Sequence, residues 1–105
     1  MIRAEFTESN GVMTGFSISG HAGSRASDVN SVVCAAVSSA VQLTVNNITE
    51  ILGIGGDEDF RENLISFNLT SQSDTASVMI AGLHFHLKCL SEDYPNTIKI
   101  TISEV

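Results

Sequence analysis

One stretch limits the possible folds of this 105-residue chain more than any other. From Val32 to about Leu52, apolar residues recur every three or four positions, which is typical of one face of an amphipathic helix. This stripe consists of Val33, Val37, Val41, Thr44, Ile48 and Leu52. Because valine and threonine are mediocre helix formers, burial against the rest of the protein must stabilise this helix. Ser31 is its predicted N-cap, and Gly53 is predicted to end it.

Segments with alternating apolar and polar residues lie on both sides of this helix and predict β-strands. The expected strands are residues 2–7, 12–19, 60–69 and 97–104. Asn10-Gly11 predicts a tight hairpin turn between the first two strands, since both residues tolerate a positive φ. Residues 57–59 are all acidic and predict an exposed turn. A second helix is expected to begin after the cap Ser73 and to end at Tyr94-Pro95.

The predicted element order is ββαβαβ, within a single domain spanning residues 1–105. A chain of this length suits one hydrophobic core. The order predicts an α+β fold, a two-layer sandwich in which two helices cover one face of a four-stranded, mainly antiparallel sheet.

The chain is acidic, with 12 Asp and Glu against 5 Lys and Arg, which gives a formal net charge of −7. This balance argues against direct binding of nucleic acid, which needs a basic surface. It suits a basic polypeptide partner, although an acidic surface also serves solubility alone. We find no run of about 20 apolar residues that predicts a membrane span, and no signal-peptide pattern at the start. We therefore expect a cytoplasmic protein with no membrane partner, whose Cys34 and Cys89 are reduced.

Cys34 is the candidate nucleophile. With Ser31 as N-cap, it occupies the third helical position, where backbone N–H groups have no helical partner and favour an anion such as a thiolate. His21 precedes it in a loop rich in glycine and serine, so the two residues suit a cysteine–histidine dyad. The same N–H groups are expected to stabilise an oxyanion. Two alternatives stay open, a small buried hydrophobic residue and a redox-sensing thiol.

Two segments, Gly20-His21-Ala22 and Val33-Cys34-Ala35-Ala36-Val37-Ser38, resemble motifs of the ribosomal-processing cysteine protease (Prp) family. The resemblance implies a cytoplasmic, homodimeric cysteine endopeptidase. Its substrate would be a large-subunit ribosomal protein precursor, from which it removes the basic N-terminal extension. Cys34 would be the nucleophile and His21 the base. A different class of function is also open, a non-catalytic peptide-binding or ribosome-assembly adaptor module.

The resemblance also indicates which residues support the site or bind substrate. They are Gly20, Ala22, Gly23, Asp28, Ser31 and Ser38. The family usually has aspartate three residues before the cysteine, where this chain has Ser31, and the loop after His21 is one residue longer here. If the family aspartate caps the helix, serine is a near-equivalent replacement. If it orients the histidine, Asp28 is the remaining candidate. Ser38 follows Cys34 by one helical turn, on the same face.

We expect no metal and no cofactor. His84 and His86 are two residues apart and face different directions on a helix, while His86 and Cys89 share a face. Two ligands are fewer than the three or four that zinc takes from a protein. We therefore place these side chains at the edge of the second buried stripe.

Overall fold

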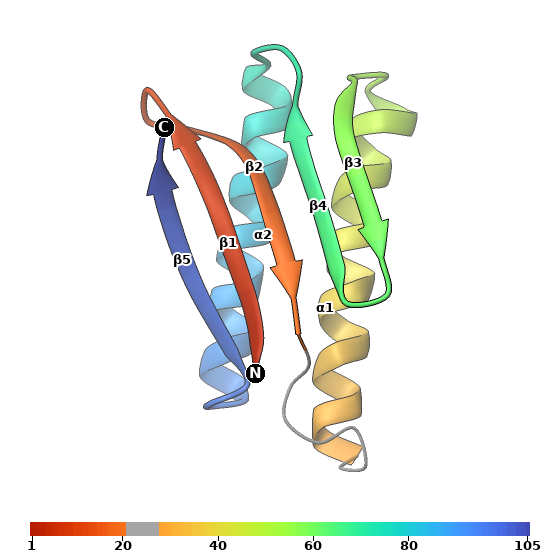
Figure 1. The fold of residues 1–105 in the computed structure, drawn as a ribbon, viewed down its shortest axis with the longest axis vertical. Helices are drawn as coiled ribbons and strands as arrows, with labels where there is room; N and C mark the ends of the chain where they lie inside the picture. Colours follow the sequence, from red (N-terminus) through yellow and green to blue (C-terminus); the bar gives the residue numbers. More distant parts are fainter. Residues whose placement is uncertain (21–27) are drawn as a thin grey trace.

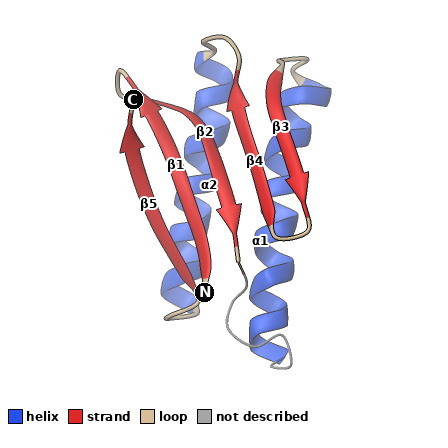
Figure 2. Ribbon diagram, viewed as in Figure 1, coloured by secondary structure: helices blue, strands red, loops and turns tan. Residues whose placement is uncertain are grey.

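The computed structural model describes residues 1–20 and 28–105, except for the side chain of Asp28. Within these ranges, five strands form one sheet, and two long helices cover one of its faces (Figure 1, Figure 2). Along the chain the elements are β1 (Ile2–Ser9), β2 (Val12–Ser19), α1 (Asp28–Asn46), the π-helical segment η1 (Asn47–Ile51), β3 (Gly56–Arg61), β4 (Leu64–Leu69), α2 (Asp74–Asp93) and β5 (Ile98–Glu104).

The strand order is β3-β4-β2-β1-β5, in which only the β1–β5 pair is parallel among the described strands. The predicted α+β class is confirmed, with a mainly antiparallel sheet and both helices on one face. The prediction of four strands is wrong. The run 60–69 is a hairpin of β3 and β4, and residues 57–59, which we predicted to be a turn, belong to β3. Acidic residues suit this position because β3 is an edge strand, where charged side chains reach solvent and discourage further pairing.

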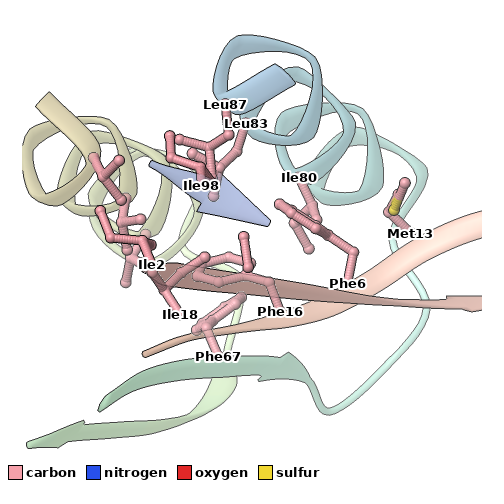
Figure 3. Packing of buried hydrophobic residues seen from close by; sticks show 14 of the residues in the cluster. Ile2, Phe6, Met13, Phe16, Ile18, Phe67, Ile80, Leu83, Leu87 and Ile98 are labelled. Carbon is pink, nitrogen blue, oxygen red and sulfur yellow. The ribbon is translucent and has the colours of Figure 1, made fainter. Parts of the chain in front are cut away.

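The β1–β2 hairpin aligns the aromatic core. Asn10 and Gly11 have φ values of 54° and 82°, and Ser9 pairs with Val12, which confirms the predicted tight turn. Phe6 pairs with Phe16, and Phe16 with Phe67, so three rings from neighbouring strands lie side by side under the helices (Figure 3). The centroids of each neighbouring pair are 6.0 Å apart. All three side chains are buried, so this row fixes how β1, β2 and β4 align.

The chain is already helical at Asp28, three residues before the predicted N-cap Ser31. Aspartate and serine are both typical of helix starts, so the sequence offered two candidates of similar strength. The end of the helical segment is confirmed. Gly53 has a φ of 68°, and the N–H of Ile54 donates to the carbonyl oxygen of Ile48 at 2.9 Å. Such a left-handed glycine satisfies carbonyl groups that the helix end leaves without partners.

One stripe of α1 and η1 is buried in the core. It consists of Val33, Val37, Val41 and Val45 of α1 and Ile48 of η1, each at most 3% exposed. In α2 the corresponding stripe is Ala76, Ile80, Leu83 and Leu87. The Ser73 side chain accepts a hydrogen bond from the N–H of Ala76 at 3.2 Å, so the predicted cap of α2 is confirmed. The predicted end of α2 at Tyr94 is confirmed as well.

Residues Val29–Ile51 are long and apolar enough to cross a membrane by length and composition, with a mean hydropathy of 1.3. We expected no such segment. It passes this test because Glu50 is its sole charged residue, while serines and alanines separate the valines. The buried stripe of a helix that packs against a sheet contributes to such a composition. Of the window that passes the test, 33% is buried inside the fold.

Candidate active site

Cys34 lies in the body of α1, six residues after Asp28. The prediction that it occupies the first turn is therefore wrong. Only the first four N–H groups of a helix lack helical partners, and the effect of the helix dipole falls off within that turn. The start of α1 thus supplies no N–H donors at Cys34, neither for a thiolate nor for an oxyanion. Ser31 is the fourth residue of α1 and is exposed, so it does not cap the helix.

A small pocket of about 70 Å³ lies beside Cys34, between α1 and the β3–β4 hairpin. Its described lining residues are Ile2, Ile18, Gly20, Cys34, Val37, Ser38, Glu62, Asn63, Leu64 and Ile65. Cys34 is half-buried and packs on one side against the core. Because it also lines this pocket, Cys34 is more than a buried hydrophobic residue. Ser38, one turn later on the same face of the helix, also lines the pocket.

Gly20 connects the end of β2 to this pocket. Its φ of 82° favours glycine, and an added Cβ would lie 2.6 Å from the carbonyl oxygen of Met1. Its N–H donates to the carbonyl oxygen of Asn63 at 3.3 Å, so β2 and the β3–β4 turn are joined at the pocket. The predicted residues His21, Ala22 and Gly23 lie outside the described residues, and so does the side chain of Asp28. Their roles stay predictions.

The sequence interpretation missed the β3–β4 turn, which contributes Glu62, Asn63 and Leu64 to the pocket. Arg61 pairs with Leu64, so Glu62-Asn63 is a two-residue turn. Neither residue has a positive φ, and neither is glycine, so the turn lacks the signature that identified Asn10-Gly11. The remaining indication of a hairpin was the length of the predicted strand, because residues 60–69 exceed the usual five or six residues of one strand. Among the described lining residues, the acidic Glu62 is the only charged one.

A second pocket of about 300 Å³ continues from the first along α1. Ser38 and Ile65 line both pockets. The other lining residues of the second are Val41, Gln42, Val45, Asn46, Phe60 and Arg61. The guanidinium of Arg61 donates hydrogen bonds of 2.9 and 2.8 Å to the Asp59 carboxylate. These hydrogen bonds, with the attraction of the charges, raise the pKa of Arg61.

Of the two histidines and the cysteine of α2, His84 packs against the core. The His84 ring packs edge-on against Phe6, with centroids 5.0 Å apart, and Phe6 is fully buried. His86 lies in a groove between α1 and α2. Within residues 1–20 and 28–105, no group of three or more His, Cys, Asp or Glu is placed to hold a metal ion.

Solved structures share this fold. SMU.848 from Streptococcus mutans superposes with a TM-score of 0.83 at 22% identity, over 100% of this chain and 96% of that one. The ribosomal processing protease Prp from S. aureus matches at 20% identity in two complexes, one with a covalently linked product peptide and one with a substrate peptide. Their TM-scores are 0.84 and 0.87, over 98% of this chain and 100% of that one. At these identities the structures establish the fold alone. No curated protein matches the sequence.

The family is established by a comparison of sequence. The family model described as cysteine protease Prp matches residues 1–99, which include both segments that carried the resemblance. It also covers every described residue that lines the pocket beside Cys34. The predicted resemblance is therefore confirmed, and this chain belongs to the cysteine protease Prp family.

Proposed function

We propose that this protein is a cysteine endopeptidase in which Cys34 is the nucleophile and His21 the general base. The observation that carries the proposal is the position of Cys34, a half-buried thiol that lines a pocket together with Gly20. Gly20 immediately precedes His21 in the chain, so the backbone enters the histidine segment at the same pocket. Covalent catalysis requires a base within reach of the nucleophile, and this proposal assigns that role to His21.

The reaction follows from these residue types. His21 accepts the proton of the Cys34 thiol, and the thiolate attacks the carbonyl carbon of the scissile peptide bond. The tetrahedral intermediate collapses, the C–N bond breaks, and the leaving amine takes the proton from the His21 imidazolium. Water then hydrolyses the thioester with His21 as base, which releases the carboxylate product and restores the thiol.

The oxyanion needs a donor other than the start of α1, since Cys34 lies beyond the first turn. We assign this role to the Ser38 hydroxyl, which follows Cys34 by one turn and lines the same pocket. Gly20 supports the pocket through its hydrogen bond to Asn63. Ala22 and Gly23 are assigned to the substrate-binding loop, and Asp28 to the orientation of His21. Ser31 has no role as a cap in this proposal.

The proposed substrate is the N-terminal extension of a large-subunit ribosomal protein precursor, cleaved in the cytoplasm by a single domain of residues 1–105. Membership in the Prp family supports this substrate, as does the S. aureus Prp complex with a substrate peptide. The charge of the chain is consistent with this substrate. A chain of net charge −7 with Glu62 at the pocket attracts a basic peptide.

We also propose a homodimer, with contacts on the faces of the helices that point away from the sheet. A groove of about 550 Å³ runs there between α1 and α2. Leu43 and Val78 line it and are 62% and 69% exposed. Apolar side chains this exposed in one groove are typical of a protein–protein contact. Light scattering of the wild type and of a Leu43→Asp, Val78→Asp variant tests this proposal, since the charges should yield a monomer.

The decisive test of the protease is a cleavage assay on the substrate peptide of the S. aureus complex, with products identified by mass spectrometry. The wild type should release two fragments, whereas Cys34→Ser and His21→Ala should release none. If Cys34→Ser retains the wild-type rate, Cys34 is not the nucleophile. If the wild type binds the peptide without cleaving it, and alkylation of Cys34 leaves the affinity unchanged, the protein is an adaptor.

A further inference from the structure

One ridge of α1 links the candidate nucleophile to three uncharged hydrogen-bonding side chains. Cys34 is followed at four-residue spacing by Ser38, Gln42 and Asn46, and we call the latter three the polar ridge. Cys34 and Ser38 line the smaller pocket, and all three residues of the polar ridge line the larger one. The two pockets therefore form one trough along α1, with the thiol at one end.

The spacing of the polar ridge matches that of an extended peptide. Four residues of an α-helix advance roughly 6 Å along its axis. Two residues of an extended chain advance roughly 6.6 Å. Each step of the polar ridge thus meets every second residue of a peptide that lies along α1. Serine, glutamine and asparagine side chains donate to and accept from backbone amides, and they do so without selecting a side chain.

The larger pocket adds an apolar surface to the trough. Val41 and Val45 belong to the buried stripe of α1 and reach this pocket from the core. Phe60 faces them from β3 and is 56% exposed, although it lies on the edge strand of the sheet. A pocket of about 300 Å³ suits one large apolar side chain. An exposed aromatic ring beside such a pocket is a favourable contact for that side chain.

We propose that the trough binds the substrate as an extended strand and that Phe60 selects one large apolar residue in it. Gln42 is eight residues after Cys34, which is roughly 12 Å along the helix and equals three or four extended residues. The selected side chain is therefore the third or fourth from the scissile bond. Gln42 and Asn46 bind the peptide backbone. This inference rests on the proposed protease function and deepens it by naming a substrate residue that the trough selects.

The test uses binding, so that it does not depend on cleavage. A fluorescein-labelled form of the S. aureus substrate peptide is titrated with Cys34→Ala protein, and anisotropy gives Kd. Peptides carry leucine, alanine or aspartate at the third and fourth positions on each side of the bond. Leucine at one of these positions should bind about ten- to a hundredfold more tightly than aspartate. Adding Phe60→Ala should remove most of that preference, and adding Gln42→Ala should weaken all the peptides about equally.

The matched control is Phe85→Ala, which removes a similarly exposed phenylalanine, 66% exposed, from α2. It should leave the preference for leucine unchanged, and circular dichroism should show that both phenylalanine variants keep their fold. If Phe60→Ala retains the full preference, the subsite is wrong, even when the wild type cleaves the peptide. If the preference disappears with Phe60 while the wild type cleaves nothing, the subsite stands and the protease proposal fails.

Discussion

The two long helices are alike in size and position but differ in what borders them. α1 and α2 have 19 and 20 residues, contact each other, and cover the same face of the sheet (Figure 1). Each contains one half-buried cysteine. The ridge that follows Cys34 lies beside the β3–β4 hairpin and forms a trough with it. The helical neighbours of Cys89 at four-residue spacing are Phe85 and Asp93, both exposed. The surroundings of a helix, more than its composition, thus decide which cysteine borders the trough.

The largest expected effect separates these two cysteines. Cys34→Ala should lower the cleavage rate by at least about a thousandfold, because the other cysteine, Cys89, lines neither pocket of the trough. Cys89→Ala should retain the rate, and thermal unfolding should be close to that of the wild type in both variants. Peptide cleavage followed by mass spectrometry measures the rates. A comparable loss of cleavage in Cys89→Ala would show that the two cysteines do not differ in their role.

The next comparison sets the buried stripes against the polar ridge. Ile80→Ala and Val41→Ala each remove a buried side chain, with exposures of 0% and 1%. The first should lower the free energy of unfolding by about 3 kcal/mol, and the second by about 2 kcal/mol, since valine loses fewer methyl groups. Gln42→Ala, one residue after Val41, should change it by less than about 0.5 kcal/mol. Urea denaturation followed by circular dichroism measures all three. An equal loss in Gln42→Ala would mean that the polar ridge serves the fold.

The features that could be predicted from the sequence have strong local causes. The valine stripe, the Asn10-Gly11 turn and the Ser73 cap each depend on residues close together in the chain. The β3–β4 hairpin could not be predicted in this way, because Glu62-Asn63 turns without glycine and without a positive φ. Its strand β4 pairs with β2, far away in the sequence, and β3 pairs in turn with β4.

The candidate site was predicted only in part, for a related reason. Cys34 and Ser38 were identified from their motif, and both line the pocket. The reason given for the reactivity of Cys34 was wrong, because Asp28 and Ser31 are equally good start signals three residues apart. Glu62 and Phe60 were missed because they reach α1 only through the hairpin. Local patterns thus identified the candidate nucleophile, while the trough beside it could be recognised only from the tertiary fold.

A smaller effect tests the start of α2, the helix whose boundaries were predicted correctly. Ser73→Ala removes the acceptor of the hydrogen bond from the Ala76 N–H. The free energy of unfolding should fall by about 1 kcal/mol, while peptide cleavage stays unchanged. Ser73→Asp should restore the stability, since aspartate is an equally good cap. Loss of cleavage in a stable Ser73→Asp variant would show that α2 takes part in the site.

The smallest expected effect concerns the ion pair between Asp59 and Arg61 on β3. Asp59→Asn removes the negative partner of Arg61, with which it forms two hydrogen bonds. The side chains are 43% and 70% exposed, so water screens the pair and the loss should leave the unfolding temperature within measurement error. The hairpin should persist, because it is held by the backbone pairing of β3 with β4 and of β4 with β2. Thermal unfolding of the wild type and the variant, at low and at high salt, checks the stability. Peptide affinity under the same conditions checks that the hairpin stays in place. A marked drop in unfolding temperature would mean that a surface charge, rather than strand pairing, places the hairpin beside α1.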